Sequence, residues 1–146
     1  MKNFQKGFTL IEIFVILGIV AILAAIVLIA INPERQFQQA NDSERWSNVN
    51  TLVNALSQYR TDSRGQLPPS ITGEEKQICK STAIATSSCA DLSLLVPTYI
   101  VAVPVDPLNM EEPNDSGYVI ATTTGNLIQI SAPKRQISTA PIHVER

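Results

Sequence analysis

Residues 6–31 read K-G-F-T-L-I-E-I-F-V-I-L-G-I-V-A-I-L-A-A-I-V-L-I-A-I, and this stretch decides the fold. No side chain from Ile13 to Ile31 is polar. We expect one helix over about residues 9–31, which at ~1.5 Å per residue is about 35 Å long and crosses a bilayer. Glu12 lies inside the start of this helix. Placing an acidic side chain in a membrane-spanning helix costs roughly 2.5–3.5 kcal/mol at the bilayer centre and less near its edge. We therefore expect Glu12 to have a function and a partner for its charge.

The charges that flank the apolar run predict its orientation. Lys2 and Lys6 precede it, whereas Glu34 and Arg35 offset each other on the far side. Positive charge favours the cytoplasmic side, so we expect a single-pass segment with its N-terminus in the cytoplasm and the remaining chain outside. A cleaved secretory signal is the competing interpretation, but the small residues at 21–25 lie in the middle of the apolar run rather than at its end.

Composition limits the function of the remaining chain. Of the 146 residues, about 115 lie beyond the apolar run, which is enough for one soluble domain. The formal net charge is −2, and no basic stripe with interleaved aromatic residues occurs, so we expect no direct nucleic-acid binding. A single histidine, with no nucleophile signature and no glycine-rich phosphate loop, predicts that the protein is not an enzyme.

The run K-G-F-T-L-I-E at residues 6–12 resembles the processing signature of type IV pilins and of type II secretion pseudopilins. In this family a prepilin peptidase cuts after the glycine and methylates the new N-terminus. The resemblance places the cut between Gly7 and Phe8 and makes Phe8 the N-methylated first residue. It also gives Glu12 an assembly role, in which its carboxylate neutralises the Phe8 amine of a neighbouring subunit in an apolar filament core. In the alternative interpretation, Glu12 snorkels to the lipid headgroups from an ordinary anchor.

The pattern beyond the apolar run predicts an α+β fold, with a long N-terminal helix packed on a small antiparallel β-sheet, as the resemblance also implies. The predicted segments are a leader at 1–7, a transmembrane and filament-core helix at 8–32, an amphipathic helix at 33–64, and a globular head at 65–146. Pro33 lacks a backbone donor, so Asn32-Pro33 should kink the helix or restart it.

Helical spacing divides the second helix into two faces. The apolar stripe is expected to contain Phe37, Ala40, Val49, Leu52, Val53, Leu56 and Tyr59. The solvated face is expected to contain Asn41, Asp42, Glu44, Arg45, Asn48, Asn54 and Gln58.

Local signals also predict the layout of the head. Residues 117–123 and 127–132 are rich in β-formers on either side of Gly125-Asn126, which predicts a hairpin. We expect residues 65–91 to form a loop with little regular structure, and residues 92–96 to form one helical turn. Residues 133–146 are expected to form a tail or a third edge strand.

Two cysteines, Cys79 and Cys89, lie in a Ser/Thr-rich segment. Outside the cytoplasmic membrane we expect them to form one disulfide, which is worth about 2–3 kcal/mol because it closes a short loop. The alternative is a pair of free thiols. A metal site would need further ligands, and His143 is remote in the sequence.

An oxygen-rich loop precedes the predicted hairpin. The run at 103–107, V-P-V-D-P, resembles the stretch before a Pro-x-Asp-Pro turn in major pseudopilins, some of which hold calcium in the loop that follows. Hard oxygen ligands suit calcium, and the candidate ligands here are Asp106, Asn109, Glu111 and Asp115. The alternative is a solvated turn, because Asp and Asn favour turns through bonds to nearby backbone groups.

The sequence therefore predicts a structural subunit of a type IV pilus-like filament. Its expected partners are copies of itself and other pilins in a helical filament, the prepilin peptidase, and a pilus or secretion assembly platform. Its expected location is the cytoplasmic membrane, and then a filament outside the cytoplasm or at the cell surface. The alternatives are a type II secretion pseudopilin and, less favoured, a monomeric membrane-anchored binding module.

Overall fold

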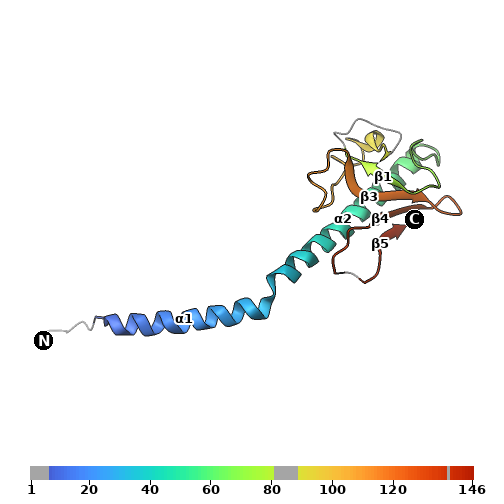
Figure 1. The fold of residues 1–146 in the computed structure, drawn as a ribbon. Coiled ribbons are helices and arrows are strands. Elements are labelled where there is room, and N and C mark those ends of the chain that lie inside the picture. Colours follow the sequence, from blue (N-terminus) through green and yellow to red (C-terminus); the bar gives the residue numbers. More distant parts are fainter. Residues whose placement is uncertain (1–6, 81–88, 138) are drawn as a thin grey trace. The chain divides into compact units, whose positions relative to one another are not determined.

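The computed structural model describes residues 7–80, 89–137 and 139–146. The chain divides into two units, residues 1–37 and residues 38–146. The first unit holds helix α1 (Leu10–Ile31) and the start of helix α2 (Pro33–Asp62). The second unit holds the rest of α2 and all the strands (Figure 1).

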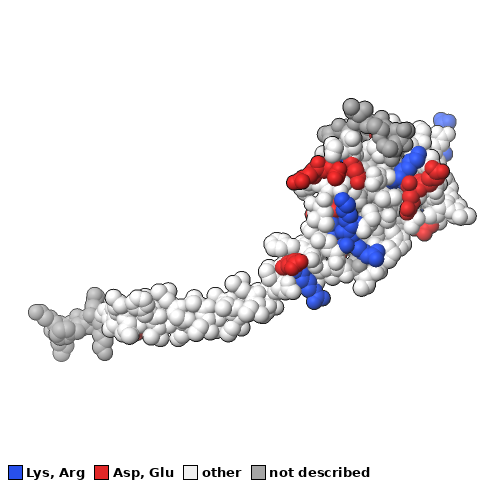
Figure 2. Space-filling model, viewed as in Figure 1, with Lys and Arg blue, Asp and Glu red and all other residues white. Residues whose placement is uncertain are grey.

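Helix α1 is the one described helix that is long and apolar enough to cross a membrane. Its large apolar side chains are exposed, and charged residues are almost absent from its visible surface (Figure 2). Apolar residues on every side of a helix require an apolar environment, because water does not solvate them favourably. The helix therefore fits membrane anchoring.

Asn32 and Pro33 separate the two helices, as the sequence predicts. Asn32 adopts the left-handed conformation with φ of 44°, and its Oδ1 atom accepts a hydrogen bond from the Arg35 backbone N–H at 3.3 Å. Pro33 occupies the first position of α2, where its missing donor is not needed for an intrahelical bond. The chain thus ends one helix and begins another within two residues.

Within its described residues, the second unit contains a five-stranded sheet in the order β2-β1-β3-β4-β5. The strands are β1 (Lys76–Cys79), β2 (Cys89–Ala90), β3 (Asp115–Thr122), β4 (Ile128–Ala132) and β5 (Ile142–Glu145). Neighbouring strands pair antiparallel except β1 and β2, which are parallel. The α+β prediction is confirmed, but the sheet is mixed rather than antiparallel.

The parallel pairing of β1 with β2 lies in residues 65–91, the segment that was expected to lack regular structure. Cys79 and Cys89 form a disulfide with their Cα atoms 5.3 Å apart, which is the pairing favoured from the sequence. This cross-link holds β2 beside β1, with Gln77 opposite Cys89. Residues 65–91 therefore contribute two strands to the sheet, so the loop prediction was wrong for 76–79 and 89–90.

The hairpin prediction is confirmed by β3 and β4. Gly125 and Asn126 have φ of 103° and 63°, which is the left-handed conformation that glycine and asparagine tolerate best. In β4, buried residues alternate with half-buried ones, so one face of the strand packs on the core. The C-terminal segment supplies the edge strand β5, and a 3₁₀ turn at Ser93–Leu95 lies within the predicted helical turn.

The core lies between α2 and the sheet (Figure 1). Its fully buried members include Val49, Leu52, Leu56, Tyr118, Ile120, Ile128, Ile130 and Ile142. Four positions of the predicted stripe, Val49, Leu52, Val53 and Leu56, are buried, and Tyr59 packs against them. The stripe prediction was wrong for Phe37 and Ala40, which are exposed. These two residues precede the part of α2 that lies over the sheet core.

Candidate processing and assembly site

The predicted cleavage site lies in the short segment before α1 that has no regular secondary structure. Gly7 and Phe8 are both exposed, and Phe8 retains 76% of its accessible surface. Among the described residues, no heavy atom beyond the chain neighbours of Gly7 lies within 4 Å of the position that its Cβ would occupy. Both residues that flank the predicted cleavage bond are therefore exposed within the described part of the chain.

Thr9 and Glu12 form a capping box at the start of α1. Thr9 is the N-cap with φ of −84° and ψ of 151°, and its Oγ1 atom accepts the Glu12 backbone N–H at 3.3 Å. The Thr9 backbone N–H donates in return to Oε2 of Glu12 at 3.4 Å. The Glu12 N–H also donates to the Thr9 carbonyl at 3.1 Å, so the donor that gains a partner from the box is the Thr9 N–H. The carboxylate also lies at the positive end of the helix dipole.

This contact was missed by the sequence analysis, although the signal was present. The spacing Thr-x-x-Glu before an apolar run is typical of a capping box. Glu12 thus has a partner within its own chain. That partner is a neutral backbone donor, so the contact lowers the cost of placing Glu12 at the membrane edge but brings no positive charge to its carboxylate.

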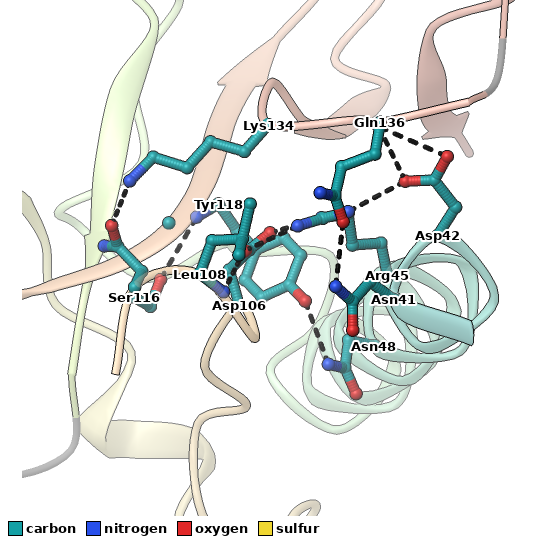
Figure 3. A network of polar contacts seen from close by, with 12 residues as sticks. Asn41, Asp42, Arg45, Asn48, Asp106, Leu108, Ser116, Tyr118, Lys134 and Gln136 are labelled. Atoms are coloured by element: carbon teal, nitrogen blue, oxygen red, sulfur yellow. Dashed lines mark hydrogen bonds and ion pairs between the residues drawn. The ribbon is translucent and has the colours of Figure 1, made fainter. Parts of the chain in front are cut away.

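A second polar cluster lies in the head, around Arg45. The guanidinium is fully buried, and its Nε and Nη2 atoms donate to Oδ2 and Oδ1 of Asp106 at 2.6 and 3.0 Å. Its Nη1 atom donates to Oδ1 of Asp42 at 2.8 Å (Figure 3). Asp42 also accepts the backbone N–H groups of Gln136 and Ile137 at 3.0 and 2.8 Å. The cluster joins α2 to the loop before β3 and to the segment after β4.

Burial and ion pairing shift the pKa of Arg45 in opposite directions. Burial alone lowers the pKa of Arg45, but the hydrogen bonds and negative charges of Asp106 and Asp42 outweigh it and raise the pKa above its usual value. The sequence analysis placed Asp42 and Arg45 on the solvated face of the helix, and that prediction was wrong. Both are buried because each charge has a partner of opposite sign.

The four calcium candidates occupy different surroundings. Asp106 is buried against Arg45, and Glu111 is exposed. Asn109 is buried, and its Nδ2 atom donates to the Asp115 carbonyl at 2.8 Å, while the Asp115 carboxylate accepts the Gly117 N–H at 2.8 Å. Among the described residues, no three His, Cys, Asp or Glu side chains gather where they could hold a metal ion.

Comparison with protein families identifies the N-terminal segment. A family model described as the prokaryotic N-terminal methylation motif matches residues 2–28. This motif is the prepilin signature of type IV pilins and pseudopilins, and it supports a type IV pilin-like or pseudopilin precursor. It points to a structural protein and suggests processing by prepilin peptidase and assembly with other pilins. No curated protein and no solved structure matches the chain.

Proposed function

We propose that this chain is a structural, non-enzymatic subunit of a type IV pilus-like filament, cut between Gly7 and Phe8 and assembled through α1. The observation that carries the proposal is Glu12, a carboxylate at the start of a helix whose remaining surface is apolar. It is five residues beyond an exposed Gly-Phe bond. Cleavage of that bond creates an ammonium group on Phe8.

The physics of the apolar filament core favours this pairing. Among the described residues of the precursor, the donor to the Glu12 carboxylate is the neutral N–H of Thr9. A carboxylate and an ammonium 4 Å apart attract each other by about 4 kcal/mol at an effective dielectric constant near 20, before the cost of desolvation. A neighbouring Phe8 amine is therefore a stronger partner than the capping contact. It exists only after cleavage, so processing and assembly are coupled.

Two substitutions separate the charge of Glu12 from its capping role. Glu12→Gln keeps a side chain that can complete the capping box but removes the charge. Thr9→Ala removes the hydroxyl that caps the helix but keeps the carboxylate. We expect Glu12→Gln to be inserted and processed but absent from filaments sheared from cells, while Thr9→Ala assembles. Normal assembly of Glu12→Gln, or failure of Thr9→Ala alone, would refute a charge-based role.

Mass spectrometry of the protein from its native host tests the processing step. We expect the mature chain to begin at Phe8 and to carry one N-terminal methyl group. Retention of residues 1–7 in the mature protein contradicts the filament proposal. It favours instead a membrane-anchored binding module that never assembles.

A type II secretion pseudopilin is the second candidate, because the V-P-V-D-P run at 103–107 resembles the corresponding stretch in major pseudopilins. Deletion of the gene distinguishes the two candidates. Loss of a surface fibre seen by electron microscopy supports a pilus subunit. Loss of secreted proteins with no change in surface fibres supports a pseudopilin.

A further inference from the structure

The backbone of residues 109–112 converges on a lysine side chain. The Nζ atom of Lys80 donates to the carbonyl oxygens of Asn109 and Met110 at 2.9 and 3.0 Å, and also to that of Glu112. The Lys80 backbone N–H donates to the Asn114 carbonyl at 3.0 Å. Lys80 directly follows β1, so the strand carries its ammonium into the loop.

A second ammonium reaches the same loop from another element. Lys134 follows β4, and its Nζ atom donates to Oδ1 of Asn109. Asn109 is buried, and its amide also donates to the Asp115 carbonyl. The candidate oxygens of Asn109 and Asp106 thus already bind the cationic groups of Lys134 and Arg45.

This geometry suits an ammonium and does not suit calcium. A lysine ammonium has three donors, and the three carbonyl oxygens around Lys80 match that number. Calcium takes 6–8 oxygen ligands at 2.3–2.6 Å, in most sites with several carboxylates. A divalent cation here would also be repelled by the charges of Lys80 and Lys134. The residues present therefore do not fit the calcium ion that some relatives of the resembled family hold in this loop.

We propose that the Lys80 ammonium group stabilises the backbone conformation of residues 109–112, and that it takes the place of a bound calcium ion in this loop. The loop is then ordered by a side chain that arrives when the sheet forms, and the stability of the head does not depend on free calcium. This proposal does not rest on the proposed function, since it concerns the folding of the head whether or not the chain assembles.

Calcium titration of the full-length protein in detergent tests the proposal directly. We expect no saturable calcium binding by isothermal titration calorimetry. We also expect the same thermal midpoint, followed by circular dichroism, in millimolar calcium and in a chelator. Lys80→Met should lower that midpoint by about 5 °C, because the buried residue Asn109 and the exposed residues Met110 and Glu112 lose the ammonium that joins their carbonyl groups, and water can replace the donor at the two exposed ones.

Lys76→Met is the matched control, because Lys76 is the first residue of β1, the strand that Lys80 follows, and it is half-buried as Lys80 is. Its midpoint should change much less. Saturable calcium binding by the wild type, or a wild-type midpoint that rises with calcium, would overturn the proposal. An unchanged midpoint for Lys80→Met would overturn it as well. If Lys80→Met does not fold, the two wild-type measurements still decide.

Discussion

Replacing Arg45 by methionine tests the buried polar cluster of the head. The substitution keeps an unbranched side chain of similar length but removes three hydrogen bonds to Asp42 and Asp106. Both carboxylates stay buried, at 7% and 0% exposure, and they lose the cation that lies between them. Two buried negative charges then lie close together with no Arg45 cation between them.

The magnitude follows from the partners that remain. Removing one member of a buried ion pair costs about 3–5 kcal/mol. Asp106 keeps the Leu108 N–H at 2.8 Å, and Asp42 keeps the N–H groups of Gln136 and Ile137. These bonds offset part of the loss, so we expect about 3 kcal/mol for Arg45→Met. That is a large share of the roughly 5–15 kcal/mol that stabilises a typical domain.

Equilibrium urea denaturation of the full chain in detergent measures the effect. Arg135→Met is the control, because Arg135 is exposed and should change stability by less than about 0.5 kcal/mol. The double variant Arg45→Met/Asp106→Asn also removes one of the two buried negative charges, so it should recover part of the lost free energy of unfolding. A loss below about 1 kcal/mol for Arg45→Met, or no recovery in the double variant, would refute the reasoning.

Three further predictions concern the same head. Gly117→Ala should lower the free energy of unfolding by about 2–4 kcal/mol, because Gly117 has φ of 87° and a Cβ there would lie 2.6 Å from Cβ of Asp106. Gly125→Ala is the control, because Gly125 has φ of 103° but lies in open space. It should lower the free energy of unfolding by only about 1 kcal/mol in the same urea titration. Burial raises the pKa of Tyr118 in the folded protein to about 12, whereas in the unfolded chain it is near 10. The contribution of this difference to the free energy of unfolding is therefore fully present below pH 10, and it should fall by about 2 kcal/mol between pH 10 and 12. Denaturation midpoints across this pH range should show a smaller decline for Tyr118→Phe. Cys79→Ser should cost about 2–3 kcal/mol by denaturation, and adding a reductant should destabilise the wild type by the same amount but leave the variant unchanged.

Features set by neighbouring residues could be predicted from the sequence. An unbroken apolar run specifies α1, Pro33 specifies the restart, and Gly125-Asn126 specifies the hairpin turn, because each signal lies within a few residues of its effect. The N-terminal methylation motif is equally local, and a family model matches it at residues 2–28. The structure reproduces the two helices and the hairpin.

The polar cluster could not be predicted because its partners are distant in the sequence. Arg45 and Asp106 are 61 residues apart, and nothing near either residue indicates the other. Helical spacing alone assigns a charged residue to the solvated face, since an unpaired charge is not buried. Strands β1 and β2 were missed for a similar reason, as β1 is four residues long and pairs with β3, which is far away along the chain.

The capping box raises the question of why residue 12 is a glutamate rather than a glutamine. Glutamine at that position can satisfy the Thr9 backbone N–H as well as glutamate can, and it carries no charge into the edge of the membrane. Capping therefore accounts for a polar side chain at position 12, and the helix dipole favours a negative one by only about 0.3–1 kcal/mol. Under the proposed function a positive partner accounts for the charge, because the proposed cleavage before Phe8 would create an ammonium group at the start of each neighbouring subunit. The contrast between Glu12→Gln and Thr9→Ala is therefore the decisive comparison for this chain.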